Sequence, residues 1–296
     1  MKKFLRIVCC ALLCIILLWG SKPVRGDSAN EVKLLYTIVN GRVIITGCEG
    51  EAEFLEIPQV IDSYAVTETA NEAFYGCRSL KRLVLPPTMR KIGDRSFYAC
   101  NSLKEVILPA NLEKLGNSAF CGCTALEHIF IPDTLTEIPE SCFRACPALS
   151  EVNIPCGIKR IGNFAFSGCM GLERVTLGED VSEIGERAFF MCGVLKTMSV
   201  PSSTIALGNE SIGYIPSNQG AVPMSGFILR GRKGSAVQEY AEMCGIKFKP
   251  STDIIRRSSA FHPSKRSQQV SEICVLSAFA LFLTVILANC AKKVRH

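Results

Sequence analysis

Residues 73–86 read AFYGCRSLKRLVLP, the first of six copies of one pattern that continues to residue 201. The copies follow at a constant spacing of 23 residues, and three positions hold the same residue type in all of them. These are the phenylalanines Phe74, Phe97, Phe120, Phe143, Phe166 and Phe189, the cysteines Cys77, Cys100, Cys123, Cys146, Cys169 and Cys192, and the leucines Leu80, Leu103, Leu126, Leu149, Leu172 and Leu195. Such a period predicts a solenoid, because one unit cannot bury its apolar face alone and neighbours must stack.

Each copy carries the signal of one short strand. Leu83 and Leu85 alternate with outward-facing residues, which is the period of a strand, and Pro86 ends the ladder because it has no N–H. Gly93 belongs to a stretch whose small residues allow a tight corner. Pro139 replaces this glycine in the third copy, and we expect it to leave the register unchanged.

The unit resembles the BspA-type leucine-rich repeat, with the pattern A-F-x-x-C-x-x-L-x-x-[IV]-x-[LI]-P-x-x-[LIV]-x-x-I-G over residues 73–201. The resemblance implies an α/β-type repeat solenoid. It is expected to be a right-handed coil with a parallel β-sheet on its concave face and irregular or short helical turns on its convex face. Residues 227–248 also resemble the C-terminal module that often follows these repeats in surface proteins of gut Firmicutes.

Residues 27–72 are expected to form an N-terminal cap. Residues 34–39 and 42–46 flank Asn40-Gly41, which is a strong signal for a β-hairpin. The segment around Phe54 resembles the strand of a degenerate repeat, and end repeats of solenoids are irregular because one of their faces meets water.

Residues 202–250 are expected to form the C-terminal cap with a short helix. Ser235 and Gln238 have the spacing of a capping box at a helix start, and Gly245 is placed to stop that helix. The glycines at 231 and 234 lack the length and the ending of a phosphate-binding loop.

Residues 1–26 have the pattern of a secretory signal peptide. Basic residues precede an apolar run over residues 7–19, which is short for a membrane span, and the expected cleavage follows Gly26. An uncleaved anchor is the alternative interpretation.

The C-terminal part of the chain predicts a membrane anchor. Residues 251–272 are polar and read as a flexible spacer. Residues 273–291 hold no charge and are long enough for a transmembrane helix, and residues 292–296 form a basic tail expected on the cytoplasmic side. The sequence therefore predicts an exported, single-pass protein with its repeats outside.

The distribution of charge argues against a nucleic-acid partner. The whole chain has a net charge of +6, but residues 27–250 hold 21 basic and 25 acidic residues, which is 21 − 25 = −4. The basic excess thus belongs to the two ends of the chain, and the folded part has no general attraction for nucleic acid.

The 16 cysteines would suggest disulfides in an exported protein. We expect the six ladder cysteines to be free and buried, because a residue repeated once per coil at an inward position is a packing element. The sequence leaves open the disulfide state of the others in the folded part, which are Cys48, Cys121, Cys142, Cys156 and Cys244; Cys142 is expected in the core.

Metal and catalytic sites are not predicted. Cys121, Cys123 and His128 lie close in sequence, but zinc needs a fourth ligand that the sequence does not supply. The chain has three histidines and none of the nucleophile, metalloprotease or phosphate-loop motifs. We therefore expect no enzyme and no cofactor.

What remains is the outward face of the predicted sheet, on which every 23rd residue falls into one of two columns. The candidate binding residues are Arg82, Glu105, His128, Glu151 and Arg174 in the first column, and Val84, Ile107, Phe130, Asn153 and Thr176 in the second. The first column sets opposite charges side by side on neighbouring strands, at Arg82 and Glu105 and again at Glu151 and Arg174. The second column begins with three apolar residues.

These columns predict a membrane-anchored cell-surface protein that binds a protein or matrix partner, as in adhesion. Two other classes remain open. One is a structural display or envelope component without a specific ligand, and the other is an enzyme or redox protein that uses its thiols.

Overall fold

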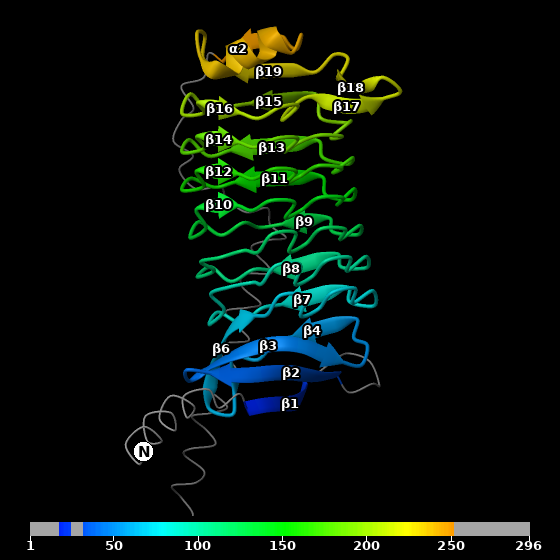
Figure 1. Cartoon of the computed structure of the whole chain (residues 1–296), viewed down its shortest axis with the longest axis vertical. Coiled ribbons are helices and arrows are strands. Elements are labelled where there is room, and N and C mark those ends of the chain that lie inside the picture. The colour runs from blue at the N-terminus through cyan, green and yellow to red at the C-terminus, as the bar shows by residue number, and fades with distance from the viewer. Residues whose placement is uncertain (1–17, 25–31, 252–296) are drawn as a thin grey trace, which may run out of the picture. The chain divides into compact units, whose positions relative to one another are not determined.

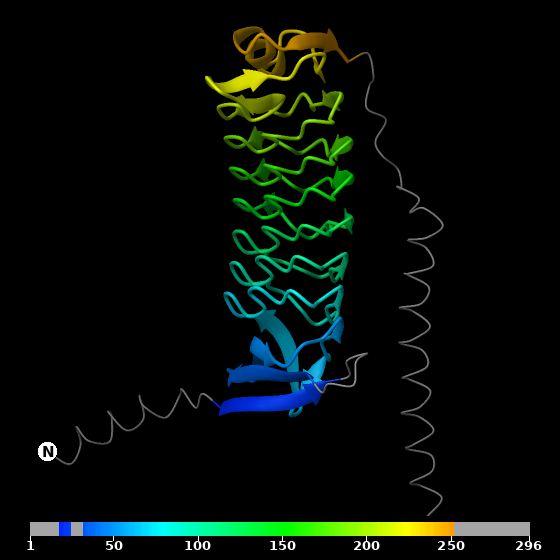
Figure 2. The ribbon, with the colours of Figure 1, turned by 90° about the vertical axis from the view of Figure 1, so that its right-hand side faces the viewer.

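Each 23-residue unit forms one turn of a coil in the computed structural model, which describes residues 18–24 and 32–251 (Figure 1). About nine turns stack one upon the next (Figure 2). One strand from each of six successive turns joins a parallel sheet, in the order β4 (Phe54–Glu56), β7 (Arg82–Val84), β8 (Glu105–Ile107), β9 (His128–Ile129), β11 (Glu151–Ile154) and β13 (Arg174–Leu177). The predicted repeat solenoid, with a parallel sheet that takes one strand from each turn, is thereby confirmed.

A second parallel ladder lies on another side of the coil, where we expected irregular or short helical turns. It consists of β10 (Glu137–Ile138), β12 (Arg160–Ile161), β14 (Glu183–Ile184) and β16 (Ala206–Leu207), and isolated bridges at residues 68, 91 and 114 mark it in earlier turns. Each of these two-residue strands places an isoleucine or leucine inward. A glycine follows β12, β14 and β16, and Pro139 takes its place after β10. Because glycine has no Cβ, the backbones of neighbouring turns can approach and extend instead of coiling.

The core is a column of aromatic rings. All six ladder phenylalanines are at most 1% exposed, and neighbouring rings stack with centroids 5.1–5.7 Å apart. The ladder leucines and the inward strand residues are buried beside them. The spacing of the rings matches the spacing of stacked strands, so the period of the sequence and the period of the coil support one another.

The N-terminal cap is a mixed sheet. Its strands, in spatial order, are β1 (Leu18–Val24), β2 (Val32–Val39), β3 (Arg42–Glu49), β6 (Tyr64–Thr69) and β5 (Val60–Ile61). Asn40 and Gly41 connect β2 to β3 with φ of 51° and 71°, as a tight hairpin turn requires. The hydroxyl of Tyr36 donates a hydrogen bond to the carboxylate of Asp62, which raises the pKa of Tyr36 to about 12.

The C-terminal cap continues the stack. The strands β15 (Thr197–Ser199), β19 (Ile228–Gly231) and β20 (Lys247–Pro250) form a parallel sheet, and β17 (Tyr214–Ser217) pairs with β18 (Gly220–Pro223). The helix α2 (Ala236–Met243) has Ser235 as its N-cap and Gly245, at φ 65°, just beyond its end. The expected capping box does not form, because the Ser235 hydroxyl donates backward to the carbonyl of Arg232 at 2.6 Å.

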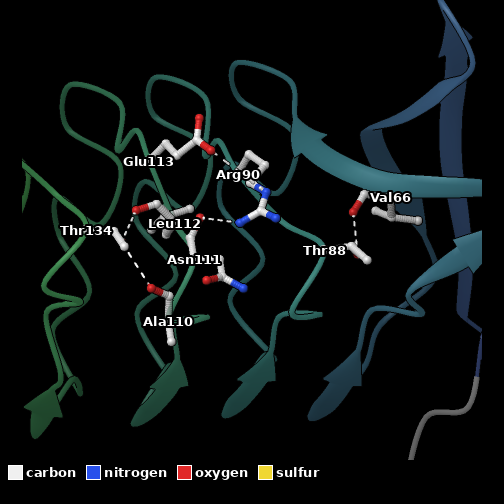
Figure 3. A network of polar contacts seen from close by, with 8 residues as sticks. All are labelled: Val66, Thr88, Arg90, Ala110, Asn111, Leu112, Glu113 and Thr134. Atoms are coloured by element: carbon white, nitrogen blue, oxygen red, sulfur yellow. Dashed lines mark hydrogen bonds and ion pairs between the residues drawn. The ribbon is translucent and has the colours of Figure 1, made fainter.

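Hydroxyl groups tie successive turns together after the sheet strands (Figure 3). Thr88 donates a hydrogen bond to the carbonyl of Val66 at 2.7 Å, and Thr134 donates to the carbonyl of Leu112 at 2.5 Å. Each acceptor lies 22 residues earlier, in the preceding turn. These side chains therefore satisfy backbone groups that a short turn would otherwise leave unpaired.

Ion pairs add a second set of links between turns. Arg90 donates to the carbonyl of Asn111 at 3.0 Å and lies 3.9 Å from the carboxylate of Glu113, as Figure 3 shows. Other pairs at the same 23-residue separation are Lys91–Glu68, Arg95–Glu72, Arg160–Glu137 and Arg187–Glu210. Most of these charged groups are exposed to water, which screens their attraction, so the pairs stabilise the stack only weakly.

Several predicted segments lie outside the described residues. They are residues 1–17 and 25–26 of the predicted signal peptide, the spacer at 252–272, the transmembrane helix at 273–291 and the tail at 292–296. Residues 18–24 of the predicted signal peptide are described and form β1. Within the part of the chain that is described, no helix has the length and apolar character needed to span a membrane.

Candidate partner-binding face

We call the outward side of the parallel sheet from β4 to β13 the sheet face. The strand register places the predicted columns on it, since Arg82 is paired with Glu105 and Val84 with Ile107. Further along, the pairs are Glu105 with His128, His128 with Glu151, Glu151 with Arg174, and Asn153 with Thr176. Nine of the ten candidate residues thus stand in strand register, and only Phe130 lies just beyond the end of its strand.

The first column holds two ion pairs, one on each side of His128. Arg82 Nε lies 3.2 Å from Glu105, and an Arg174 guanidinium nitrogen lies 2.7 Å from Glu151, so both predicted ion pairs form. The hydrogen bond that Arg174 donates to the carboxylate of Glu151 raises the pKa of Arg174. His128 stands in register between the two glutamates. Charge on this row is therefore balanced locally and leaves no strong field of one sign.

The second column carries the apolar part of the sheet face. Val84 and Ile107 are half-buried neighbours, whereas Phe130 follows β9 and is 63% exposed. Asn153 and Thr176 continue the column with polar side chains. A phenylalanine exposed to this degree, in the same column as two other apolar side chains, is the kind of surface that a partner covers.

The structure extends the sheet face at its N-terminal end in a way that the sequence did not reveal. Phe54 on β4 stands in register with Arg82, whose guanidinium carbon lies 5.7 Å from the centre of the phenylalanine ring. The step from Phe54 to Arg82 is 28 residues, so extending the 23-residue columns missed it. Glu56, the next outward residue, is paired with Val84.

The C-terminal cap presents a similar but basic surface. Ile228 and Lys247 continue the column of Thr197, and Arg230 and Lys249 continue that of Ser199. Thr197 and Ile228 are 31 residues apart, and Ile228 and Lys247 are 19 residues apart. Because neither separation equals 23, the alignment could not be found from the sequence period. The outward rows of the caps and repeats are thus apolar near β7 and β8 and cationic at β20.

The buried thiols do not form a reactive centre. Five ladder cysteines donate a hydrogen bond of 3.2–3.4 Å to the carbonyl of the phenylalanine 26 residues earlier; they are Cys100, Cys123, Cys146, Cys169 and Cys192. These five are free and buried, as expected, and burial raises their pKa values. The expectation of burial was wrong for the sixth, Cys77, which is only half-buried because it lies at the end of the repeat array. Cys142 also lies in the core, whereas Cys156 is exposed.

Native-state alkylation should separate these thiols. Burial raises the pKa of Cys100 and Cys169 from the ordinary 9.0 to about 12, so at mildly alkaline pH their thiolates are about a thousandfold scarcer. We expect exposed Cys156 to react with iodoacetamide while the five thiols stay unlabelled, as measured by mass spectrometry of the digested chain. Urea should make all of them reactive. Labelling of Cys123 as fast as that of Cys156 would contradict the buried ladder.

The residues considered as metal ligands in the sequence, Cys121, Cys123 and His128, do not share one environment. Cys123 points into the core, whereas His128 is an exposed member of the sheet face. Across residues 32–251, no three side chains of histidine, cysteine, aspartate or glutamate come together in a group that could hold a metal ion. The groups that the sheet face presents are apolar side chains and paired charges, which suit apolar contact and ion pairing.

Comparison with known proteins agrees with this architecture. The family described as "BspA type Leucine rich repeat region" matches residues 67–196 and 137–217, with six copies. No curated protein sequence matched the chain. The solved leucine-rich repeat protein of T. pallidum is 26% identical with a TM-score of 0.58, and the similarity covers 79% of this chain and 95% of that one.

Two further solved structures share the fold at lower identity. A leucine-rich cell surface protein from Faecalibacterium prausnitzii is 23% identical, with a TM-score of 0.54 and 71% of each chain covered. A leucine-rich repeat protein from Bacteroides ovatus is 21% identical, with a TM-score of 0.54, covering 77% of this chain and 68% of its own. The region that the family model matches, residues 67–217, spans the repeats and part of the C-terminal cap.

Proposed function

Because the chain belongs to the BspA-type leucine-rich repeat family, we propose that it is a non-catalytic interaction module that binds a protein or matrix partner through its sheet face. The observation that carries the proposal is the apolar row of Val84, Ile107 and Phe130, whose last member is 63% exposed. Solenoids use their extended faces for binding, and exposed aromatic residues are frequent anchors of protein interfaces.

The charges beside this row indicate the character of the partner. An apolar group of the partner would cover Phe130, while the two ion pairs, Arg82 with Glu105 and Arg174 with Glu151, would fix the partner's register. Such paired charges favour specificity more than affinity, because each is already neutralised within the sheet.

We also propose that the repeats act outside the cell on a membrane anchor. The secretory pattern of residues 1–26 and the uncharged run at 273–291 support this arrangement. The C-terminal segment at 273–291 would hold the protein in the membrane. A protein anchored in this way, with a binding face outside the cell, could act in adhesion.

The test compares binding of full-length variants to a panel of purified extracellular-matrix proteins by surface plasmon resonance. We expect the double substitution Ile107→Ser and Phe130→Ser to weaken binding at least about tenfold, because truncating an interface anchor costs about 2 kcal/mol or more. The matched control is Ile205→Ser, which removes a 78% exposed apolar side chain beside β16 and should leave affinity unchanged.

Three outcomes would count against the proposal in different ways. Equal binding by the wild type and the double variant would move the site away from the sheet face. An equal loss in the Ile205→Ser control would indicate general stickiness of apolar surface. Absence of binding to the whole panel would favour the display component without a specific ligand.

A further inference from the structure

The first ladder cysteine differs from the five that follow. Each later thiol donates to the carbonyl of the phenylalanine 26 residues earlier, but the residue 26 positions before Cys77 is Glu51. The Sγ atom of Cys77 instead lies 3.9 Å from the Sγ atom of Cys48. The end of the repeat array thus brings together two thiols that belong to different structural units.

The backbone is also close at this point. Cys48 lies near the end of β3, and a Cβ built on the preceding Gly47 would be only 3.3 Å from the carbonyl oxygen of Ala73. The amide of Ala70 donates to the carbonyl of Ile45 at 2.7 Å, which holds β3 against the start of the first repeat. A disulfide requires two backbones that approach in this way.

The two thiols can be reached from outside. They line a pocket of about 280 Å³, together with Glu51, Phe74 and Arg78 among others. Both cysteines are half-buried, whereas the later ladder cysteines are buried. A small reagent can therefore meet this pair while the rest of the ladder stays covered by its neighbouring turns.

We propose that Cys48 and Cys77 are a thiol pair that closes into a disulfide by exchange with an external low-molecular-weight disulfide, such as oxidised glutathione. The Cys48 thiolate attacks the external disulfide, forms a mixed disulfide and releases one thiolate. Cys77 then attacks the Cys48 sulfur, forms the internal bond and releases the second thiolate. The pair loses two electrons, the external disulfide gains them, and the two protons leave with the two released thiols.

The geometry and the acidity of the pair fit this order of events. The sulfur atoms must approach by about 2 Å to reach the bond length of about 2.05 Å, which side-chain rotation at a pocket wall allows. The two thiols share a hydrogen bond in which either sulfur can be the donor. Where Cys77 donates it, the pKa of Cys48 is lowered, which suits Cys48 as the attacking thiol and Cys77 as the resolving one.

Closure would join the N-terminal cap to the first turn of the repeats. That turn has the cap as its neighbour on one side, and a terminal turn of a solenoid is where opening begins. The bond would close a loop between residues 48 and 77, which restricts the unfolded chain. We therefore expect the oxidised protein to melt roughly 5–10 °C higher than the reduced one.

The sequence makes closure straightforward to measure on the full-length chain. Trypsin cuts after Arg42 and next after Arg78, so both cysteines fall in the single peptide 43–78, which holds no other cysteine. The reduced protein is incubated with reduced and oxidised glutathione, quenched with iodoacetamide after unfolding, and digested. We expect this peptide to lose two hydrogens and carry no alkyl group, while peptides with Cys100 and Cys123 carry one on every cysteine.

Variants distinguish an internal bond from chance reactivity. Cys48→Ser should abolish both closure and the gain in melting temperature, whereas Cys156→Ser, which removes an exposed thiol, should leave both unchanged. Peptide 43–78 with two alkyl groups, under conditions that put glutathione on Cys156, would overturn the proposal. A stable mixed disulfide on Cys48 without closure would overturn it as well.

Discussion

Replacing Phe120 by alanine should lower the free energy of unfolding by about 3–5 kcal/mol, as is usual when a buried aromatic side chain is truncated. Phe120 is fully buried, and its ring stacks between those of Phe97 at 5.3 Å and Phe143 at 5.7 Å. The substitution removes both contacts and leaves a cavity that the turns above and below cannot fill, because their backbones are fixed by the ladders.

The chain offers a matched control ten residues later. Phe130→Ala removes the same side chain from an exposed position, and it should change stability by no more than about 0.5 kcal/mol. Both variants are compared by urea unfolding followed by circular dichroism. Similar losses in the two would show that the ring column is not what holds the turns together.

The position of the substituted phenylalanine within the repeat array should also affect how sharply the protein unfolds as urea increases. A solenoid is stabilised by contacts between nearest neighbours, so a weak point in the middle can separate the unfolding of its two parts. We expect Phe120→Ala to broaden the urea transition, and Phe74→Ala, at the edge of the array, to leave it sharper.

The period of the sequence was sufficient to predict the repeats. A phenylalanine recurs at the position of Phe97, and an apolar residue at the position of Val106, in each of the six repeats. If neighbouring units stack, the constant 23-residue spacing alone predicts the burial of these residues and the strand register. The predicted pairs of Arg82 with Glu105 and of Glu151 with Arg174 depend on that register alone, and both form. Local pattern and global fold agree here, as is typical of repeat proteins.

Features that depend on irregular spacing were not predictable. Phe54 and Lys247 belong to the outward columns through cap strands whose connections have their own lengths. Cys48 meets Cys77 only because the cap ends where a preceding turn would have supplied a phenylalanine carbonyl. The second ladder was missed because two-residue strands are too short to show an alternating pattern.

Pro139 replaces one glycine in the glycine column, which is the row of glycines at positions 93, 116, 162, 185 and 208 beside the second ladder. It shows how the stack responds to a side chain at this position. The register is kept, as predicted, but Phe120 and Phe143 at this junction have the widest ring spacing of the stack, 5.7 Å against 5.1–5.4 Å elsewhere. Among the described strand pairs and bridges, none joins Lys114 to Glu137 across it. The column therefore accepts a side chain only where neighbouring turns move apart.

The same crowding predicts a large effect of a small substitution. A Cβ added at Gly116 would lie 2.4 Å from the amide nitrogen of Asp94 and from the carbonyl carbon of Gly93, both backbone atoms of the preceding turn. Because neither can rotate away, we expect Gly116→Ala to widen the stack and lower the free energy of unfolding by about 3 kcal/mol.

Gly193→Ala is the matched control for this prediction. A Cβ at Gly193 meets no heavy atom within 4 Å, and its φ is not positive, so alanine should be neutral or stabilise the fold by up to about 1 kcal/mol through the unfolded state. Urea unfolding of both variants gives the comparison. If Gly116→Ala were as stable as Gly193→Ala, the glycines would reflect turn propensity alone. A loss confined to Gly116→Ala would show that the distance between backbones selects glycine in this column.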